Sequence, residues 1–296
     1  MSIMVQDLTK SFSPTTGIFN VSFEIKQGEV FGYLGPNGAG KTTTIRNLMG
    51  FMHPDSGSSS IKGLDCWKQR AEIKKYVGYV PGEINFVEGM TGMELLKLAG
   101  DMRELKDFTL RDRLIERFDI NTKAKIKRMS KGMKQKIGIV AGFMHDPEIL
   151  ILDEPSSGLD PLMQNEFIKL TLEEKKRGKT ILMSSHMFEE VSRTCDRISI
   201  IKDGRLVITD QTMNLEALQG KVYTVIVKSS KDVEFLESTG LDIVAISDFT
   251  LSIRIKNDYK TLLTALSKCE VTNLDNAKQG LEETFLNFYA KGGGIK

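Results

Sequence analysis

The sequence has few cysteines, almost no net charge and no long hydrophobic run, and each shortage excludes a class of protein. Its 3 cysteines, Cys66, Cys195 and Cys269, are far apart and lack metal-ligand spacing, so we expect free thiols in a reducing compartment such as the cytosol. The 41 Lys and Arg residues nearly balance the 39 Asp and Glu residues, so no nucleic-acid partner is expected. The longest apolar run, Ile137 to Met144, is far shorter than the ~20 residues that span a bilayer, and no signal peptide is evident. Any membrane association is therefore expected to come through a partner.

The patterns along the chain predict one large domain with an appendage, or two domains. Hydrophobic residues make up 40% of the sequence, enough for a sizeable core. Residues 1–215 alternate apolar strand patterns with amphipathic helix patterns, which is typical of an α/β domain with a mainly parallel sheet. Within this domain, residues 83–147 lose the strand signal and predict a helical insertion. Residues 216–296 predict a small α+β domain, with strand patterns at 221–228 and 243–255 and helix patterns at 259–267 and 281–290.

The strongest chemical signal is the run Gly35-Pro36-Asn37-Gly38-Ala39-Gly40-Lys41-Thr42, which matches the phosphate-loop pattern GxxxxGK[ST]. It lies between a predicted strand and a predicted helix, as a phosphate loop should. Its glycines would let backbone N–H groups turn toward phosphate oxygens, and the helix N-terminus would add its positive dipole end. Lys41 would neutralise the β- and γ-phosphates, and Thr42 would bind Mg²⁺. The alternative, a Gly-rich turn with an accidental lysine, is disfavoured by the flanking strand and helix.

A second signal is the apolar run 149–152, which leads directly into Asp153 and Glu154. A strand buried on both faces would deliver these carboxylates to the carboxyl edge of the sheet, where open α/β sheets bind ligands. Asp153 would hold Mg²⁺ directly or through water, and Glu154 would polarise the attacking water. Taken alone, the acidic pair could equally be a helix N-cap after a core strand. Beside a phosphate loop, this alternative becomes minor.

With these two motifs, the first two-thirds of the sequence resembles the nucleotide-binding subunit of an ATP-binding cassette (ABC) transporter. Residues 129–135 are similar to the LSGGQ signature of that family, residues 157–160 resemble its D-loop, and His186 resembles its switch histidine. The resemblance implies an ATPase with a P-loop fold, an antiparallel N-terminal β part and a helical insertion. On this resemblance, the residues that touch the nucleotide are Phe12, Gly35, Pro36, Asn37, Gly38, Ala39, Gly40, Lys41, Thr42, Thr43, Glu83, Ser130, Lys131, Gly132, Met133 and Asp160. The catalytic residues are Glu154 and His186, and the residues at Mg²⁺ are Thr42 and Asp153.

Two of these positions have an ordinary structural alternative. Phe12 stands where the family places the aromatic residue that stacks on adenine, but it could equally be a core residue of an N-terminal strand. His186 follows an apolar strand and could be a histidine at the edge of the core. Its order and spacing after the other motifs favour a contact with the γ-phosphate.

Two segments depart from the family pattern. In the signature, Lys131 replaces the first glycine and Met133 replaces the glutamine, whereas Ser130 and Gly132 are kept. After Pro81, where the family usually has the Q-loop glutamine, the chain has Gly82 followed by Glu83. We expect Glu83 to take the place of that glutamine, although its carboxylate would alter the charge around Mg²⁺.

The resemblance also implies partners. Two copies, or one copy and a paralogous ATPase, would close head to tail around two MgATP molecules. A polytopic membrane subunit would dock in a groove of the insertion near Phe86, Val87, Met90 and Met93 and hold the chain at the cytoplasmic face of the membrane, unless these residues are simply the insertion's core.

The single cassette and the segment Gly280 to Leu286 resemble ATPases of bacterial ABC-2 type exporters, which implies export of peptides, antibiotics or other amphipathic compounds. The alternative is a soluble ABC ATPase that acts on ribosomes, DNA or signalling without a membrane partner. A net charge of +2 and the lack of a second cassette disfavour it. A third reading is a switch that binds ATP but barely hydrolyses it. Only the altered signature and Q-loop support that reading.

Overall fold

The computed structural model describes residues 2–84, 89–212, 221–255 and 259–277. It divides the chain into two compact units, Met1–Gln211 and Thr212–Lys296. The boundary expected from the sequence, between residues 215 and 216, falls outside the described residues.

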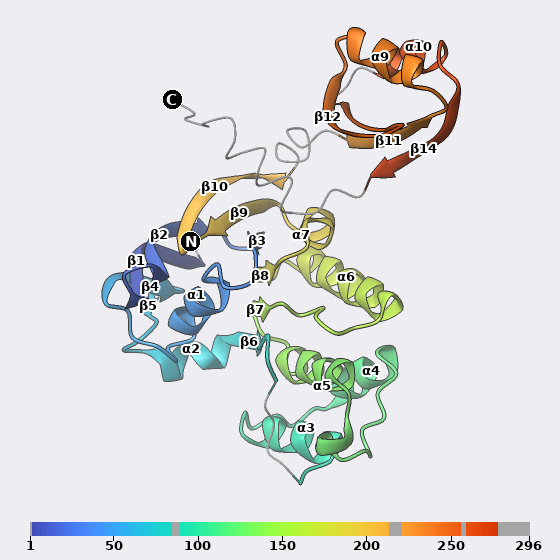
Figure 1. Ribbon diagram of the computed structural model, residues 1–296. Coiled ribbons are helices and arrows are strands. Elements are labelled where there is room, and N and C mark those ends of the chain that lie inside the picture. The colour runs from blue at the N-terminus through green and yellow to red at the C-terminus, as the bar shows by residue number, and fades with distance from the viewer. Residues whose placement is uncertain (1, 85–88, 213–220, 256–258, 278–296) are drawn as a thin grey trace. The chain divides into compact units, whose positions relative to one another are not determined.

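In the part of the first unit that the structure describes, the strands form two sheets (Figure 1). Its strands are β1 (Ile3–Ser13), β2 (Thr16–Ile25), β3 (Val30–Leu34), β4 (Ser56–Ile61), β5 (Leu64–Asp65), β6 (Val77–Val80), β7 (Ile149–Asp153), β8 (Thr180–Ser185), β9 (Arg197–Lys202) and β10 (Arg205–Gln211). The antiparallel sheet has the order β2-β1-β4-β5, and the larger sheet has the order β10-β9-β3-β8-β7-β6. In the larger sheet, neighbouring strands are parallel except that β10 is antiparallel to β9. The predicted mixed, mainly parallel sheet with an antiparallel N-terminal part is confirmed.

Helix α1 (Lys41–Leu48) lies between the two sheets. It contacts β2 and β4 of the antiparallel sheet and β7 of the larger one. The other helices that the structure describes in this core are α2 (Arg70–Tyr76), α6 (Pro161–Lys176) and α7 (Phe188–Thr194). Ile45 and Leu48 of α1 are fully buried in one core with residues of both sheets. The helix that follows the phosphate loop is therefore held from two sides.

The parallel strands explain why distant motifs meet. In the larger sheet β8 lies between β3 and β7, and all three strands run in the same direction. Every residue of these three strands is buried, as expected for strands covered on both faces. Their carboxyl ends therefore bring the segments after Leu34, Leu152 and Ser184 to one edge of the sheet.

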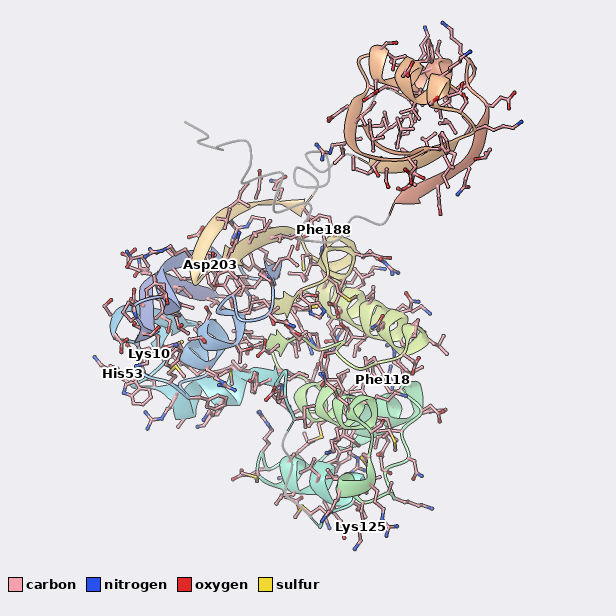
Figure 2. The ribbon with its side chains drawn as sticks, in the orientation of Figure 1. Lys10, His53, Phe118, Lys125, Phe188 and Asp203 are labelled. Atoms are coloured by element: carbon pink, nitrogen blue, oxygen red, sulfur yellow. The ribbon has the colours of Figure 1, made fainter. Side chains whose placement is uncertain are left out.

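Helices replace strands between β6 and β7, as predicted. They are α3 (Gly92–Asp101), α4 (Thr109–Arg117), a short 3₁₀ helix, η1 (Ile126–Arg128), and α5 (Lys131–Phe143). Thr91 and Glu94 form a capping box at the start of α3, the arrangement that satisfies two free N–H groups at a helix N-terminus. Phe118, labelled in Figure 2, is fully buried at the end of α4. The insertion thus has apolar residues of its own to pack.

The described residues of the second unit form a four-stranded antiparallel sheet with two helices. The elements follow the order β11 (Lys221–Val227), α9 (Ser230–Ser238), β12 (Asp242–Ser247), β13 (Thr250–Ile255), α10 (Tyr259–Leu266) and β14 (Val271–Ala277). This βαββαβ order is typical of ferredoxin-like domains. The strand expected over 243–255 is wrong, because Asp248, with a φ of 51°, turns the chain and splits the segment into a hairpin. Helix α9 and strand β14 were not predicted, and the helix pattern at 281–290 lies outside the described residues.

Candidate active site

The loop between β3 and α1 has the backbone of a phosphate loop. Gly40, the N-cap of α1, has a φ of 107°, which side chains rarely adopt. A Cβ added at Gly35 would lie 2.4 Å from the Ile201 carbonyl oxygen. Glycine is therefore required at both positions, by conformation at one and by a close backbone approach at the other.

Lys41, the first residue of α1, is buried under this loop. Its Nζ donates to the carbonyl oxygens of Gly35 and Pro36 at 2.7 and 3.0 Å and forms an ion pair with Glu154 Oε1 at 3.0 Å. Only 4% of the Lys41 side chain is exposed. A buried ammonium needs close oxygen partners, and these three hold it at the centre of the loop.

The carboxylate of Glu154 connects the loop to His186. Glu154 Oε2 lies 3.2 Å from His186 Nδ1, while the other oxygen pairs with Lys41. The backbone of Glu154 is left-handed, with a φ of 46°, a conformation that costs a non-glycine residue about 1–2 kcal/mol. The Glu154 N–H is held by the Ser184 hydroxyl at 3.0 Å. This left-handed turn places the Glu154 carboxylate between Lys41 and His186, at the carboxyl edge of the sheet.

Asp153, one residue earlier, is fully buried. Its Oδ1 accepts a hydrogen bond of 2.6 Å from the Ser184 hydroxyl, and the two residues are paired in register across β7 and β8. Within the described part of the chain, Oδ2 is buried without a hydrogen-bond partner. Burial raises the pKa of this carboxyl, and the Ser184 hydrogen bond opposes the rise. A buried carboxylate oxygen next to the Thr42 side chain, which interacts with this carboxyl and lines the same cavity, fits a ligand of a hard divalent cation such as Mg²⁺.

These side chains line one cavity of about 580 Å³. Of the residues predicted to form the site, those lining it are Phe12, Asn37, Gly38, Gly40, Lys41, Thr42, Thr43, Glu83, Lys131, Asp153, Glu154 and His186. Those predicted but not among its lining residues are Gly35, Pro36, Ala39, Ser130, Gly132, Met133 and Asp160. The structure thus brings the phosphate loop, the acidic pair and the histidine together within one chain.

The family follows from similarity to known proteins. Residues 18–157 match the protein family described as ABC transporter. An uncharacterized ABC transporter ATP-binding protein of Nostoc sp. (strain PCC 7120) is 33% identical over 302 aligned residues, which cover 96% of this chain and 89% of the relative. The chain belongs to the ABC transporter ATP-binding proteins. It binds and hydrolyses ATP.

Other members of the ABC family are similar over part of this chain. The linearmycin resistance ATP-binding protein LnrL of Bacillus subtilis is 37% identical, and the bacitracin transport ATP-binding protein BcrA of Bacillus licheniformis is 36% identical. Each alignment covers 69% of this chain and 68% of the relative.

Solved ABC cassettes have the same fold. An ATP-binding subunit of an ABC transporter superposes with a TM-score of 0.66 at 30% identity, over 74% of this chain and 93% of that one. The ADP- and phosphate-bound dimer of the cassette MJ0796 gives a TM-score of 0.64 at 20% identity, over 71% of this chain and 98% of that one. The second similarity concerns the fold alone.

Two of the predicted ABC nucleotide contacts cap helices. Ser130, in the signature, accepts from the Met133 N–H at 3.2 Å at the start of α5. Asp160, in the D-loop, accepts from the Met163 N–H at 3.0 Å at the start of α6. Each side chain satisfies an N–H group that the helix leaves free. Lys131 alone among the four signature residues named above lines the cavity of its own chain.

Phe12 lies at the end of β1 and is 55% exposed. It lines the same cavity as the phosphate loop. The alternative in which Phe12 is a core residue is therefore wrong, and its ring is free to take a stacking partner.

Phe12→Ala is expected to weaken ATP binding about tenfold, because stacking of one base on an aromatic ring contributes roughly 1–3 kcal/mol. Calorimetric titration with ATP measures the loss. Inorganic triphosphate, which has no base, should bind both proteins equally. Phe51→Ala, which removes another ring that is 51% exposed, is the control. Equal losses for ATP and triphosphate would show that Phe12 supports the loop rather than the base.

Sequence reasoning missed several residues around the site. Ser184 holds both Asp153 and Glu154, and the buried Glu190 accepts from the Ser185 hydroxyl at 2.6 Å, directly before His186. Arg46 also lines the cavity, together with Ser157 of the predicted D-loop. Ser184 could have been found, because aligning the carboxyl ends of two parallel strands places it opposite Asp153.

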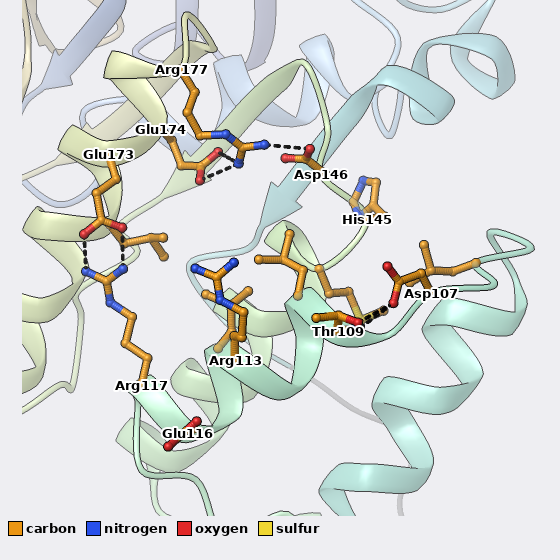
Figure 3. A pocket seen from close by; sticks show the side chains of 15 residues that line it. Asp107, Thr109, Arg113, Glu116, Arg117, His145, Asp146, Glu173, Glu174 and Arg177 are labelled. Atoms are coloured by element: carbon orange, nitrogen blue, oxygen red, sulfur yellow. Dashed lines mark hydrogen bonds and ion pairs between the residues drawn. The ribbon is translucent and has the colours of Figure 1, made fainter.

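A second cavity, of about 860 Å³, lies between α4, the end of α5 and α6 (Figure 3). Arg117 of α4 forms a two-pronged ion pair with Glu173 of α6, with Nη1 and Nη2 at 2.6 and 2.9 Å from the carboxylate oxygens. His145 lines the same cavity, and burial lowers its pKa to about 4. The cavity thus marks where the insertion is tied to the core, away from the phosphate loop.

Proposed function

We propose that this chain is the ATPase subunit of an exporter. In this proposal two copies close head to tail around two MgATP molecules and drive a separate membrane subunit. The arrangement of Lys41 and His186, each within 3.2 Å of the Glu154 carboxylate, carries the ATPase part of the proposal. The similarity to a linearmycin resistance protein and a bacitracin transport protein supports export of antibiotics or related amphipathic compounds.

The residues of the site have different roles in ATP hydrolysis. Backbone N–H groups of the loop and Lys41 bind and neutralise the β- and γ-phosphates. Glu154 accepts a proton from the attacking water, and His186 orients the Glu154 carboxylate and contacts the γ-phosphate. Asp153 and Thr42 would hold Mg²⁺, which neutralises phosphate charge when bound. Phe12 stacks on adenine, and Glu83, exposed at the edge of the cavity, replaces the usual glutamine.

The signature explains why a second copy is needed. Ser130 and Gly132, the signature residues that this chain shares with the family, are not among the residues that line the cavity of their own chain. A head-to-tail dimer would present them to the nucleotide of the other copy. Because one chain carries every motif, a homodimer would form two equivalent sites.

The membrane partner is proposed to bind the insertion. In the described residues no helix is long and apolar enough to cross a bilayer. Met90 and Met93 are half-buried at the start of α3, so side chains of this adaptable kind remain partly available to a partner helix. Phe86, Val87 and the segment Gly280 to Leu286 lie outside the described residues. Docking here would hold the chain at the cytoplasmic face of the membrane.

Purification of the tagged chain from detergent-solubilised native membranes tests the transport role. A polytopic membrane protein should be recovered with the wild type, and its amount should fall about tenfold with Met90→Glu, because burying a charge in an apolar contact is costly. Met102→Glu is the matched control, since Met102 lies in the same insertion and is 80% exposed. Recovery of only ribosomes or soluble proteins would support the alternative of a soluble ABC ATPase and overturn export.

A further inference from the structure

The N-terminal part of α5 contacts residues 155–158 of the same chain. Gln135 Nε2 donates to the Pro155 carbonyl oxygen at 3.0 Å, and both atoms are buried. Gly132 packs against Gly158, because a Cβ added at Gly132 would come within 2.4 Å of the Gly158 carbonyl oxygen. Lys131 Nζ donates to the Ser157 hydroxyl at 2.9 Å. The signature turn and the segment that follows Glu154 therefore meet through three separate contacts.

Lys131 is unfavourably placed for helix stability. It is the first residue of α5, where the dipole is positive, and the first turn contains no acidic residue. A cation at a helix N-terminus opposes the dipole. Among the described residues, the ammonium of Lys131 donates to the Ser157 hydroxyl rather than to a carboxylate. The lysine is thus not explained by the stability of α5.

The backbone at Gly158 shapes the position of Lys131. Gly158 has a φ of 80°, and a Cβ added there would lie 3.1 and 3.2 Å from Cγ and Cδ of Lys131. The methylene groups of the Lys131 side chain therefore pack directly against the Gly158 backbone, and this contact directs the ammonium toward Ser157. A side chain at 158 would push these methylene groups away.

The contact joins the two segments that the proposed dimer needs. Residues 155–158 begin directly after Glu154 and lead to Asp160, the N-cap of α6. The turn at Ser130 and Gly132 is the part of α5 that would face the nucleotide of the second copy. If the two segments moved independently, each would have to be ordered separately as the dimer closes, at its own entropic cost.

We propose that Lys131 is a positioning residue that ties the signature turn to Ser157, so that both segments reach the nucleotide of a second copy as one unit. The inference rests on the proposed head-to-tail dimer. The hydrogen bond acts within each chain, and it acts on closure of the dimer rather than on binding of ATP to the phosphate loop.

A double-mutant cycle tests this role. Lys131→Met, Ser157→Ala and the double variant are made in a Glu154→Gln background, in which ATP is expected to remain bound. ATP-dependent dimerisation is measured by sedimentation, and the affinity of the dilute chain for ATP by titration. Each single variant should weaken dimerisation about three- to tenfold, the range expected for one hydrogen bond made at an exposed site. The double variant should lose no more than either single variant, because both remove the same contact.

Matched variants separate positioning from a general effect of charge. Lys131→Arg keeps a donor and should restore most of the dimerisation that Lys131→Met loses. Lys127→Met removes an exposed lysine one turn before α5 and should have no effect. In the otherwise wild-type chain, Lys131→Met and Ser157→Ala should raise the concentration of chain needed for half-maximal ATPase activity.

Two different failures can be told apart. A loss with Lys131→Met that adds to that of Ser157→Ala, or that occurs without any effect of Ser157→Ala, would mean that the lysine acts elsewhere, and would overturn the positioning role alone. A Glu154→Gln chain that binds ATP but never dimerises would overturn the proposed dimer, and this inference with it.

Discussion

Glu154→Gln should lower the rate of ATP hydrolysis about 10²- to 10⁴-fold, the range that a general base contributes. The amide has the size of the carboxylate but cannot accept a proton from water. Glu154 is the group that lies between Lys41 and His186, at 3.0 and 3.2 Å, so its loss removes the acceptor without removing the phosphate loop. Phosphate release under saturating ATP measures the effect. The same variant should retain ATP and accumulate as a dimer in gel filtration.

Glu148→Gln provides the control for this substitution. Glu148 immediately precedes β7, at the opposite end of the strand from Glu154, and its exposed carboxylate pairs with Lys62. Turnover should be unchanged in that variant. If hydrolysis persisted undiminished in Glu154→Gln, another residue would have to activate water, and the assignment of the site would be wrong. If both variants lost activity, the effect would be on folding rather than on catalysis.

Lys41→Met should weaken the binding of ATP about 100-fold, because the charge-assisted hydrogen bonds of a buried ammonium to phosphate oxygens are lost. Methionine keeps most of the volume of the side chain, so the loop should still pack. The loss should be as large for inorganic triphosphate as for ATP, since Lys41 contacts phosphates and not the base. This pattern is the opposite of the one expected for Phe12→Ala, and calorimetric titration with both ligands distinguishes them.

Lys68→Met is the matched control for Lys41→Met. Lys68 is an exposed lysine outside the cavity, and its loss changes net charge by the same amount. A thermal melt of each variant shows whether the fold survives, because removing Lys41 takes away the ammonium that pairs with the Glu154 carboxylate. Retention of full ATP affinity by a folded Lys41→Met protein would contradict the phosphate-loop assignment.

Much of the candidate site could be predicted because its residues occur in short contiguous segments of the sequence. The phosphate loop needs glycines at fixed positions before a lysine, so its pattern survives without any knowledge of the fold. Asp153 and Glu154 follow a run of four apolar residues, and that run indicated a buried strand ending in acids. These segments lie at strand ends, and the parallel sheet follows from their alternation with helices.

The second unit shows where such reasoning fails. The apolar alternation over 243–255 continues through the turn, so the pattern did not reveal the hairpin at Asp248, which depends on a single residue with a φ of 51°. Helix α9 is short and mostly polar, and its apolar face becomes evident only when Leu236 is buried against the sheet.

The family, the order of the motifs and the residues proposed to bear the chemistry could be predicted from the amino-acid sequence, because each depends on neighbours in the chain. The side chains that support them become visible only when the strands and helices are packed together. Ser184 holds Asp153 and Glu154 because β8 lies beside β7, and Lys131 reaches Ser157 because α5 crosses the loop after β7. Such contacts join residues that are 26 and 31 positions apart. They arise from the packing of strands and helices, which a linear pattern does not record.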